Sequence, residues 1–154
     1  MKINFKKLAV CIIAPLAVGA LSALISRSGM ENYGMMTKPP LAPPAWVFPV
    51  VWTVLYILMG VSSYLISESG KSTEKAMIPY VAQLAVNFLW SPIFFLLENY
   101  VFAFIWLIAL IVLVVWTAVS FYGIDKTSGL LFIPYIVWLA IAAYLNFGVF
   151  LLNR

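Results

Sequence analysis

Three stripes of side chains could form a binding site, because each places a tryptophan on one face of a helix. Within each stripe the residues recur three or four positions apart, which is the spacing of one helical face. The stripes are Trp52, Tyr56, Met59 and Ser63; Gln83, Asn87, Trp90 and Phe94; and Pro134, Trp138, Ala142 and Leu145. An amide such as that of Asn87 is costly in an apolar interior unless it bonds to another helix or to a ligand. These residue types predict a pocket that binds a ligand by burying its apolar surface, with a few hydrogen bonds that orient the ligand. The alternative is that the rings only pack or lie at a membrane interface, which we expect for Trp46, Trp106 and Trp116.

Several kinds of chemistry are excluded by residues that the chain lacks. It has no histidine, which excludes a His-ligated haem, a His-containing zinc centre and a Ser-His-Asp triad. No Asp, Glu, Lys or Arg falls inside the apolar runs, which disfavours an ion-coupled transporter. We expect no metal site.

The elements that must position the stripes are membrane-spanning helices. Hydrophobic residues make up 65% of the 154 residues and charged residues 9%, which is incompatible with a soluble domain that has a polar surface. Five runs are long enough to cross about 30 Å of hydrocarbon, and none alternates with the period of a barrel strand. The sequence therefore predicts an all-α membrane protein, a five-helix transmembrane bundle forming one domain over residues 1–154, with spans at 8–25, 45–67, 78–97, 101–122 and 129–152.

The segment between the first two spans, residues 26–44, is longer than a simple connection requires. Prolines 39, 40, 43 and 44 prohibit helix and stiffen the chain. We expect this segment to act as a lid that carries Tyr33 and Met35 over the pocket. A passive surface loop is the alternative.

Basic residues near the ends of the spans predict the orientation. Six lysines fall on one side of a five-span bundle (Lys2, Lys6, Lys7, Lys71, Lys75 and Lys126), and Arg27, Lys38 and Arg154 fall on the other. We expect an integral protein of a bacterial cell membrane with a cytoplasmic N-terminus. A cleaved signal peptide is the alternative for the first span, although the run is long for one. Because the charges lie at span ends, they indicate lipid head groups and not nucleic acid as their partner.

Three stretches carry a resemblance to a known family. "KPPLAPPAWVFPVVWTVLY" from Lys38, "AQLAVNFLWSPIFF" from Ala82 and "PYIVWLAIAAYLNF" from Pro134 resemble the tryptophan-rich sensory proteins, TspO, which are relatives of the mitochondrial translocator protein. The resemblance implies a five-helix bundle, often dimeric, with a pocket under the first loop for porphyrins and for benzodiazepine-type or isoquinoline carboxamide ligands. It also implies light-dependent degradation of protoporphyrin IX, in which tryptophans matching Trp52 and Trp138 take part. Asn87, Trp90 and Ala142 match pocket positions of the family.

The chain departs from the family pattern in places. Leu41 stands where relatives usually have tryptophan, and Phe147 replaces the tyrosine of the animal cholesterol motif, which puts sterol recognition in doubt.

Residues and resemblance together predict a porphyrin-binding membrane protein that needs no cofactor, with protoporphyrin IX as ligand or substrate. We expect Trp52 and Trp138 to take part in photo-oxidation, because indole is the most easily oxidised common side chain. The sequence leaves open whether the protein is then an enzyme or a photosensitive binding protein. A tetrapyrrole transporter and a ligand-responsive regulatory scaffold remain alternative functions. A homodimer is also possible. The predicted ligand-binding residues are Tyr33, Phe48, Trp52, Tyr56, Asn87, Trp90, Phe94, Trp138, Ala142 and Leu145.

Overall fold

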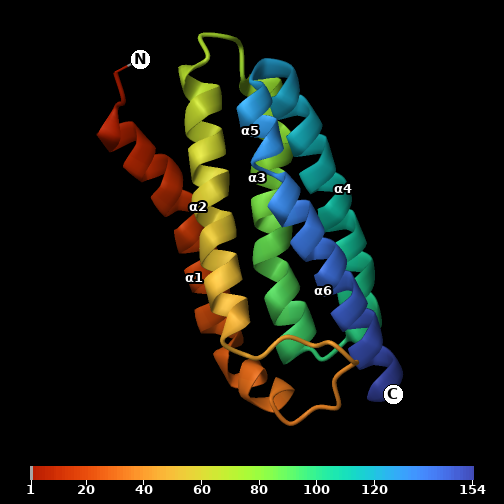
Figure 1. The fold of residues 1–154 in the computed structure, drawn as a ribbon. Coiled ribbons are helices and arrows are strands. Elements are labelled where there is room, and N and C mark those ends of the chain that lie inside the picture. The colour runs from red at the N-terminus through yellow and green to blue at the C-terminus, as the bar shows by residue number, and fades with distance from the viewer. Residues whose placement is uncertain (1) are drawn as a thin grey trace.

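The computed structural model describes residues 2–154, and all of its regular elements are helices (Figure 1). In chain order they are α1 (Phe5–Tyr33), α2 (Val47–Glu68), α3 (Glu74–Ser91), the π-helical turn η1 (Pro92–Leu96), α4 (Tyr100–Ile124), α5 (Lys126–Leu130) and α6 (Ile133–Leu152). Five stretches are long and apolar enough to cross a membrane, with α3 and η1 forming one of them and α5 and α6 another. The predicted all-α fold with five spanning helices is confirmed.

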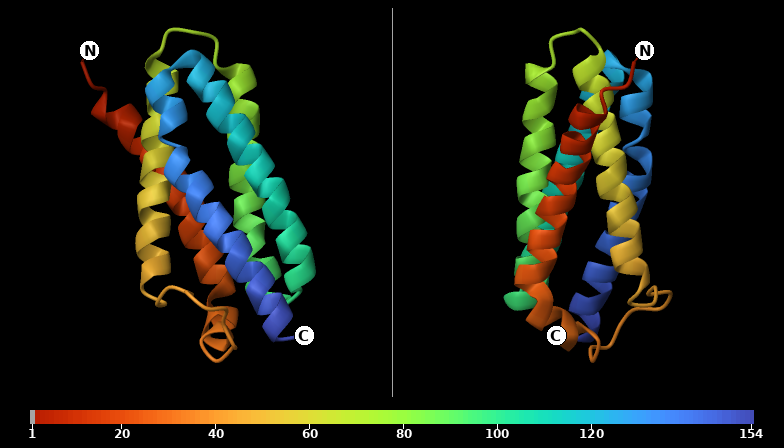
Figure 2. Two further views of the ribbon diagram at one scale, coloured as in Figure 1. Left: turned by 45° about the vertical axis from the view of Figure 1, so that its right-hand side comes forward. Right: turned by 90° about the vertical axis from the view of Figure 1, so that its left-hand side faces the viewer.

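The helices lie side by side, with the two chain ends at opposite ends of the bundle (Figures 1 and 2). Helix α1 packs on α2 and η1, α3 packs on α4, and α4 packs on α6. Tyr135, Phe121 and Phe132 are among the largest fully buried side chains. Because helices satisfy their own backbone hydrogen bonds, apolar side chains can cover the outside of the bundle as well as its core.

The first helix is longer than the sequence predicts, so the predicted loop of residues 26–44 is wrong at its start. Residues 26–33 belong to α1, and the loop spans residues 34–46. The apolar run ends near Ile25, but Ser26 and Gly29 are buried. A Cβ at Gly29 would overlap the backbone of Phe95 in η1. Close packing against η1 therefore extends the helix past the apolar run.

Proline explains two irregular points in the bundle. Pro134 lies in the first turn of α6, and a proline there cannot donate to the carbonyl of Leu130 and would clash with it. The last span accordingly breaks between α5 and α6. Pro92 in the same way leaves the Phe88 carbonyl without its helical donor, and Ser22 of α1 donates its hydroxyl to that oxygen at 2.7 Å.

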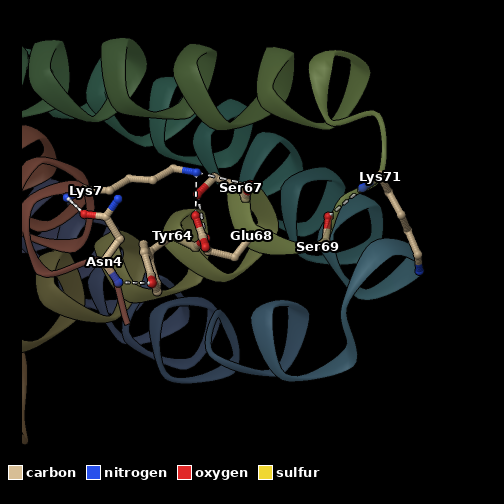
Figure 3. A network of polar contacts seen from close by, with 7 residues as sticks. All are labelled: Asn4, Lys7, Tyr64, Ser67, Glu68, Ser69 and Lys71. Carbon is tan, nitrogen blue, oxygen red and sulfur yellow. Dashed lines mark hydrogen bonds and ion pairs between the residues drawn. The ribbon is translucent and has the colours of Figure 1, made fainter. Parts of the chain in front are cut away.

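Polar contacts close the end of the bundle at which the N-terminus lies (Figure 3). The Asn4 backbone N–H donates to the Tyr64 hydroxyl at 3.0 Å, and Lys7 forms an ion pair with Glu68 at 2.6 Å. These contacts join the start of α1 to the end of α2.

Asp125 caps the N-terminus of α5. Its carboxylate accepts from the Ser128 backbone N–H at 2.7 Å and from the Ser128 hydroxyl at 2.8 Å. These two hydrogen bonds, helped by nearby Lys71, hold the pKa of the Asp125 carboxyl below its ordinary value. The cap favours the charged form.

Candidate functional site

A cavity of about 400 Å³ lies between α1, α2, η1 with the end of α3, and α6. This volume is within the range of small-molecule sites in proteins. Within residues 2–154, no charged side chain lines it. Its walls are formed by Gly19, Ser22, Ala23, Met30, Tyr33, Ala45, Phe48, Pro49, Trp52, Tyr56, Asn87, Trp90, Ser91, Phe94, Phe95, Trp138, Ala142, Leu145 and Asn146.

The cavity brings together all ten residues predicted from the sequence as ligand-binding. They come from four separate segments: Tyr33 from α1; Phe48, Trp52 and Tyr56 from α2; Asn87, Trp90 and Phe94 from α3 and η1; and Trp138, Ala142 and Leu145 from α6. Each of the three stripes therefore contributes residues to one space, although Met59, Ser63, Gln83 and Pro134 do not line it.

Sequence reasoning missed the wall that α1 contributes. Gly19, Ser22 and Ala23 line the cavity, and they share one helical face by their spacing. Residues 19–23 carry no aromatic ring, so the search for tryptophan stripes passed over this part of α1. The signal that could have found it is the small size of these residues, because small side chains leave room between helices.

Stacked rings form two of the walls. Trp52 stacks on Tyr56 with ring centroids 5.6 Å apart, and Trp90 stacks on Phe94 at 5.1 Å. In both pairs the residues are four apart on one helix, the spacing that brings side chains into contact. Trp138 of α6 meets Phe48 edge-on, with centroids 5.7 Å apart. The walls thus present flat apolar surfaces of the kind that hold aromatic ligands.

Three buried polar atoms at the cavity residues have no hydrogen-bond partner within the described chain. They are Trp90 Nε1, Trp138 Nε1 and Asn146 Oδ1. An unpaired buried donor or acceptor is costly, and a ligand that satisfies these atoms would recover that cost. All three residues also line the cavity.

Both asparagines also bond between helices. Asn87 Nδ2 donates to the Tyr135 hydroxyl at 3.0 Å, and Asn146 Nδ2 donates to the Tyr100 carbonyl at 2.8 Å. Asn146 therefore bonds to another helix, and the same residue lines the cavity as well.

The remaining tryptophans lie outside the cavity, as the sequence predicts. Trp106 Nε1 donates to the Val86 carbonyl at 2.8 Å and so joins α4 to α3. Trp46 and Trp116 are exposed on the surface of the chain.

The loop of residues 34–46 crosses the end of the bundle that lies away from the N-terminus (Figures 1 and 2). The Asn153 amide exchanges two hydrogen bonds with the Thr37 backbone, at 2.8 and 3.3 Å. The Tyr144 hydroxyl donates to the Pro40 carbonyl at 2.6 Å. These contacts attach the loop to α6 and its C-terminal cap.

Of the two residues assigned to the loop as a lid, only Met35 lies in it. Tyr33 is the last residue of α1, and its ring contacts Phe94 and Phe95 at the cavity. Met35 is 83% exposed and does not line the cavity, so its expected position over the pocket is wrong. Leu41 is 95% exposed, and its departure from the family pattern therefore removes no ring from the walls.

Among residues 2–154, no three His, Cys, Asp or Glu side chains lie close enough together to hold a metal ion. The hydrogen-bonding and aromatic groups of the cavity are suited to an organic guest.

Comparison with known proteins identifies the family. Residues 11–152 match the TspO/MBR family. The chain is 39% identical to protein CrtK of Rhodobacter capsulatus, over 94% of this chain and 91% of that protein. It is 37% identical to the tryptophan-rich protein TspO of Archaeoglobus fulgidus, over 97% and 99% of the two chains, and 37% identical to the human translocator protein, over 83% and 78%. The chain is an integral membrane protein that belongs to the TspO/MBR family.

Proposed function

We propose that this protein binds porphyrins in the tryptophan-walled cavity and promotes the light-dependent oxidation of protoporphyrin IX. The observation that carries the proposal is the cavity itself, which is uncharged and lined by indoles from α2, α3 and α6. A large flat apolar ligand would bind there mainly through burial, at roughly 25 cal/mol per Å² of apolar surface removed from water. Benzodiazepine-type and isoquinoline carboxamide ligands share this flat aromatic character.

Lys38 is suited to bind the carboxylate groups of a porphyrin. Its ammonium lies 5.1 Å from the centroid of the Tyr33 ring and donates to the Gly34 carbonyl at 3.2 Å. The ion pair found within residues 2–154 joins Lys7 to Glu68 and leaves Lys38 without a carboxylate partner. Since Tyr33 lines the cavity, we propose that porphyrin propionates emerge beside it and meet this cation.

The oxidation needs no acid, base or metal from the protein. The indole of Trp52 or Trp138 gives one electron to the light-excited macrocycle and is left as a radical cation. Dioxygen then accepts the transferred electron as superoxide, which returns the macrocycle to its neutral state. The macrocycle next gives one electron to the indole radical cation, so the indole is restored and the macrocycle becomes the radical cation. This radical combines with superoxide, and a carbon–oxygen bond forms on the macrocycle. Dioxygen is therefore the consumed oxidant, and it supplies the oxygen atoms of the degraded product.

Illumination of four variants tests the photochemistry. Trp52→Phe and Trp138→Phe should slow the loss of porphyrin absorbance severely, while affinity in the dark falls only modestly because phenylalanine keeps an apolar ring. Trp106→Phe and Trp116→Phe are matched controls outside the cavity. Equal decay in all four variants would mean that porphyrin loss is ordinary bleaching, which would leave binding as the function.

A second comparison tests the role of Lys38. Lys38→Met should weaken binding of protoporphyrin IX and leave binding of its dimethyl ester unchanged, because the ester has no carboxylate. Equal weakening of both ligands would contradict the proposed ion pair.

We also propose a cytoplasmic N-terminus in a bacterial cell membrane. The segments that carry six of the seven lysines, residues 2–7, 71–75 and 126, lie at the end of the bundle that carries the N-terminus (Figure 1), and basic residues favour the cytoplasmic side. Protease access to a tag on either terminus, in intact cells and in inverted vesicles, distinguishes the two orientations.

Crosslinking in bilayers over a range of protein densities tests whether the protein forms a homodimer.

A further inference from the structure

A buried chain of hydrogen bonds runs from Asn87 at the cavity to Met59 in the core. Asn87 Nδ2 donates to the Tyr135 hydroxyl at 3.0 Å, and that hydroxyl donates to Gln83 Oε1 at 2.9 Å. Gln83 Nε2 donates to Met59 Sδ at 3.7 Å. All four side chains are buried, and Gln83 is fully so. This chain of hydrogen bonds joins α3 to α6 and to α2.

The methionine fixes the direction of this chain. A thioether sulfur can accept a hydrogen bond but cannot donate one, so Gln83 must turn its NH₂ group toward Met59 and its carbonyl oxygen toward Tyr135. The single hydroxyl proton of Tyr135 is then used on Gln83. Tyr135 can only accept from its other neighbour, and Asn87 must supply the N–H.

The opposite direction would set the Gln83 carbonyl oxygen against the sulfur, where two acceptors repel. It would also turn the NH₂ group of Asn87 toward the cavity. In the observed direction the NH₂ group is held by Tyr135, and Asn87 Oδ1 is left for the cavity that this residue lines.

The side-chain amide of Asn146 is held in the same orientation, with its NH₂ group toward a neighbouring helix. Its Nδ2 donates to the Tyr100 backbone carbonyl at 2.8 Å, and a carbonyl can only accept. Its Oδ1 is buried without a partner. Two asparagines on two helices thus turn their carbonyl oxygens away from their helix-to-helix partners.

We propose that these two fixed amides make the cavity selective for flat aromatic ligands that carry an N–H donor on their outer edge. Met59, Gln83 and Tyr135 act as positioning residues, because they orient Asn87 without lining the cavity. The inference rests on the proposed function only in taking the cavity as the ligand site. The pyrrole N–H groups of a closed porphyrin point to its centre, so edge donors define a further ligand class.

Two tricyclic probes of nearly the same shape test the proposal. Carbazole carries an edge N–H where fluorene carries a CH₂ group. Because one neutral hydrogen bond changes affinity by a factor of about two to ten, carbazole should bind the wild-type protein about fivefold more tightly than fluorene. Binding is measured by displacement or by fluorescence titration of the protein in nanodiscs.

The carbazole-to-fluorene affinity ratio, measured in variants, tests the role of the hydrogen-bond chain. Tyr135→Phe removes the hydroxyl link, and Met59→Leu conserves volume but removes the acceptor that sets direction. Each should lower the carbazole-to-fluorene ratio by at least about twofold while fluorene affinity stays nearly constant. Tyr64→Phe is the matched control, since this hydroxyl lies at the N-terminal end of the bundle (Figure 3). If Tyr135→Phe fails to fold, Met59→Leu decides.

The outcomes separate this inference from the proposed function. A wild-type ratio near one, a ratio unchanged in the folded variants, or no binding of either tricycle would overturn the inference. Protoporphyrin IX is titrated in parallel. Loss of porphyrin binding alone, with the tricycle ratios as expected, would overturn only the proposed function.

Discussion

Replacing Asn153 by alanine should accelerate both entry and exit of ligand, because Asn153 attaches the loop of residues 34–46 to the end of α6. The substitution removes both hydrogen bonds to the Thr37 backbone. Neither Asn153 nor Thr37 lines the cavity. The change therefore loosens the loop without altering the surface that a ligand would touch.

The magnitude follows from the two lost bonds. At about 0.5–1 kcal/mol net for each bond, the closed loop loses about 1–2 kcal/mol. Since about 1.4 kcal/mol corresponds to a factor of ten, the ratio of open to closed loop should rise about fivefold to thirtyfold. Tyr144→Phe removes one bond to the Pro40 carbonyl and should raise the ratio about twofold to fivefold.

Stopped-flow fluorescence of protoporphyrin IX binding measures the effect. Association and dissociation rates should rise together, while the equilibrium affinity changes by less than about threefold, because opening is needed in both directions. Asn32→Ala, an exposed position at the same end of the molecule, is the control. Unchanged rates in both loop variants, with the helices intact, would show that the loop is not the gate.

Four further substitutions test the packing, a cap and the assignment of one tryptophan. Gly60→Ala would overlap the backbone of α1 and should lower the free energy of unfolding by about 1–3 kcal/mol. Gly123→Ala, which has open space around it, should stabilise α4 by up to about 1 kcal/mol. Asp125→Asn should remove a stabilisation that is fully present above the ordinary carboxyl pKa of 3.8, so the difference in melting temperature from wild type should shrink as the pH falls through the lowered folded pKa. Trp106→Phe should cost about 0.5–1.5 kcal/mol, through the lost bond to Val86, and leave porphyrin affinity unchanged.

The spans and most of the cavity could be predicted because both depend on short-range patterns. Apolar runs without charge define spanning helices, and a tryptophan stripe such as Trp52 and Tyr56 needs only helical spacing to be recognised. The end of α1 could not be read in this way. Its last turns are polar, and they are helical because Gly29 packs on η1, a contact between residues far apart in the sequence.

The orientation of the polar groups could not be predicted from the sequence either. The sequence marks Asn87 as a costly amide but does not show which of its two ends faces the cavity. That depends on Tyr135, Gln83 and Met59, which come from three helices. The break before α6 had a local signal in Pro134.

Filling the cavity tests the central claim most directly. Ala142 on α6 lines the cavity, whereas Ala140, two positions away, is exposed on the outside of the chain. Protoporphyrin IX is titrated into Ala142→Trp and Ala140→Trp in nanodiscs, with helix content monitored in both. If the cavity is the porphyrin site, Ala142→Trp should weaken binding at least about tenfold, because the added indole occupies space the ligand needs, and Ala140→Trp should bind as wild type does. Equal affinity in the two folded variants would contradict the account.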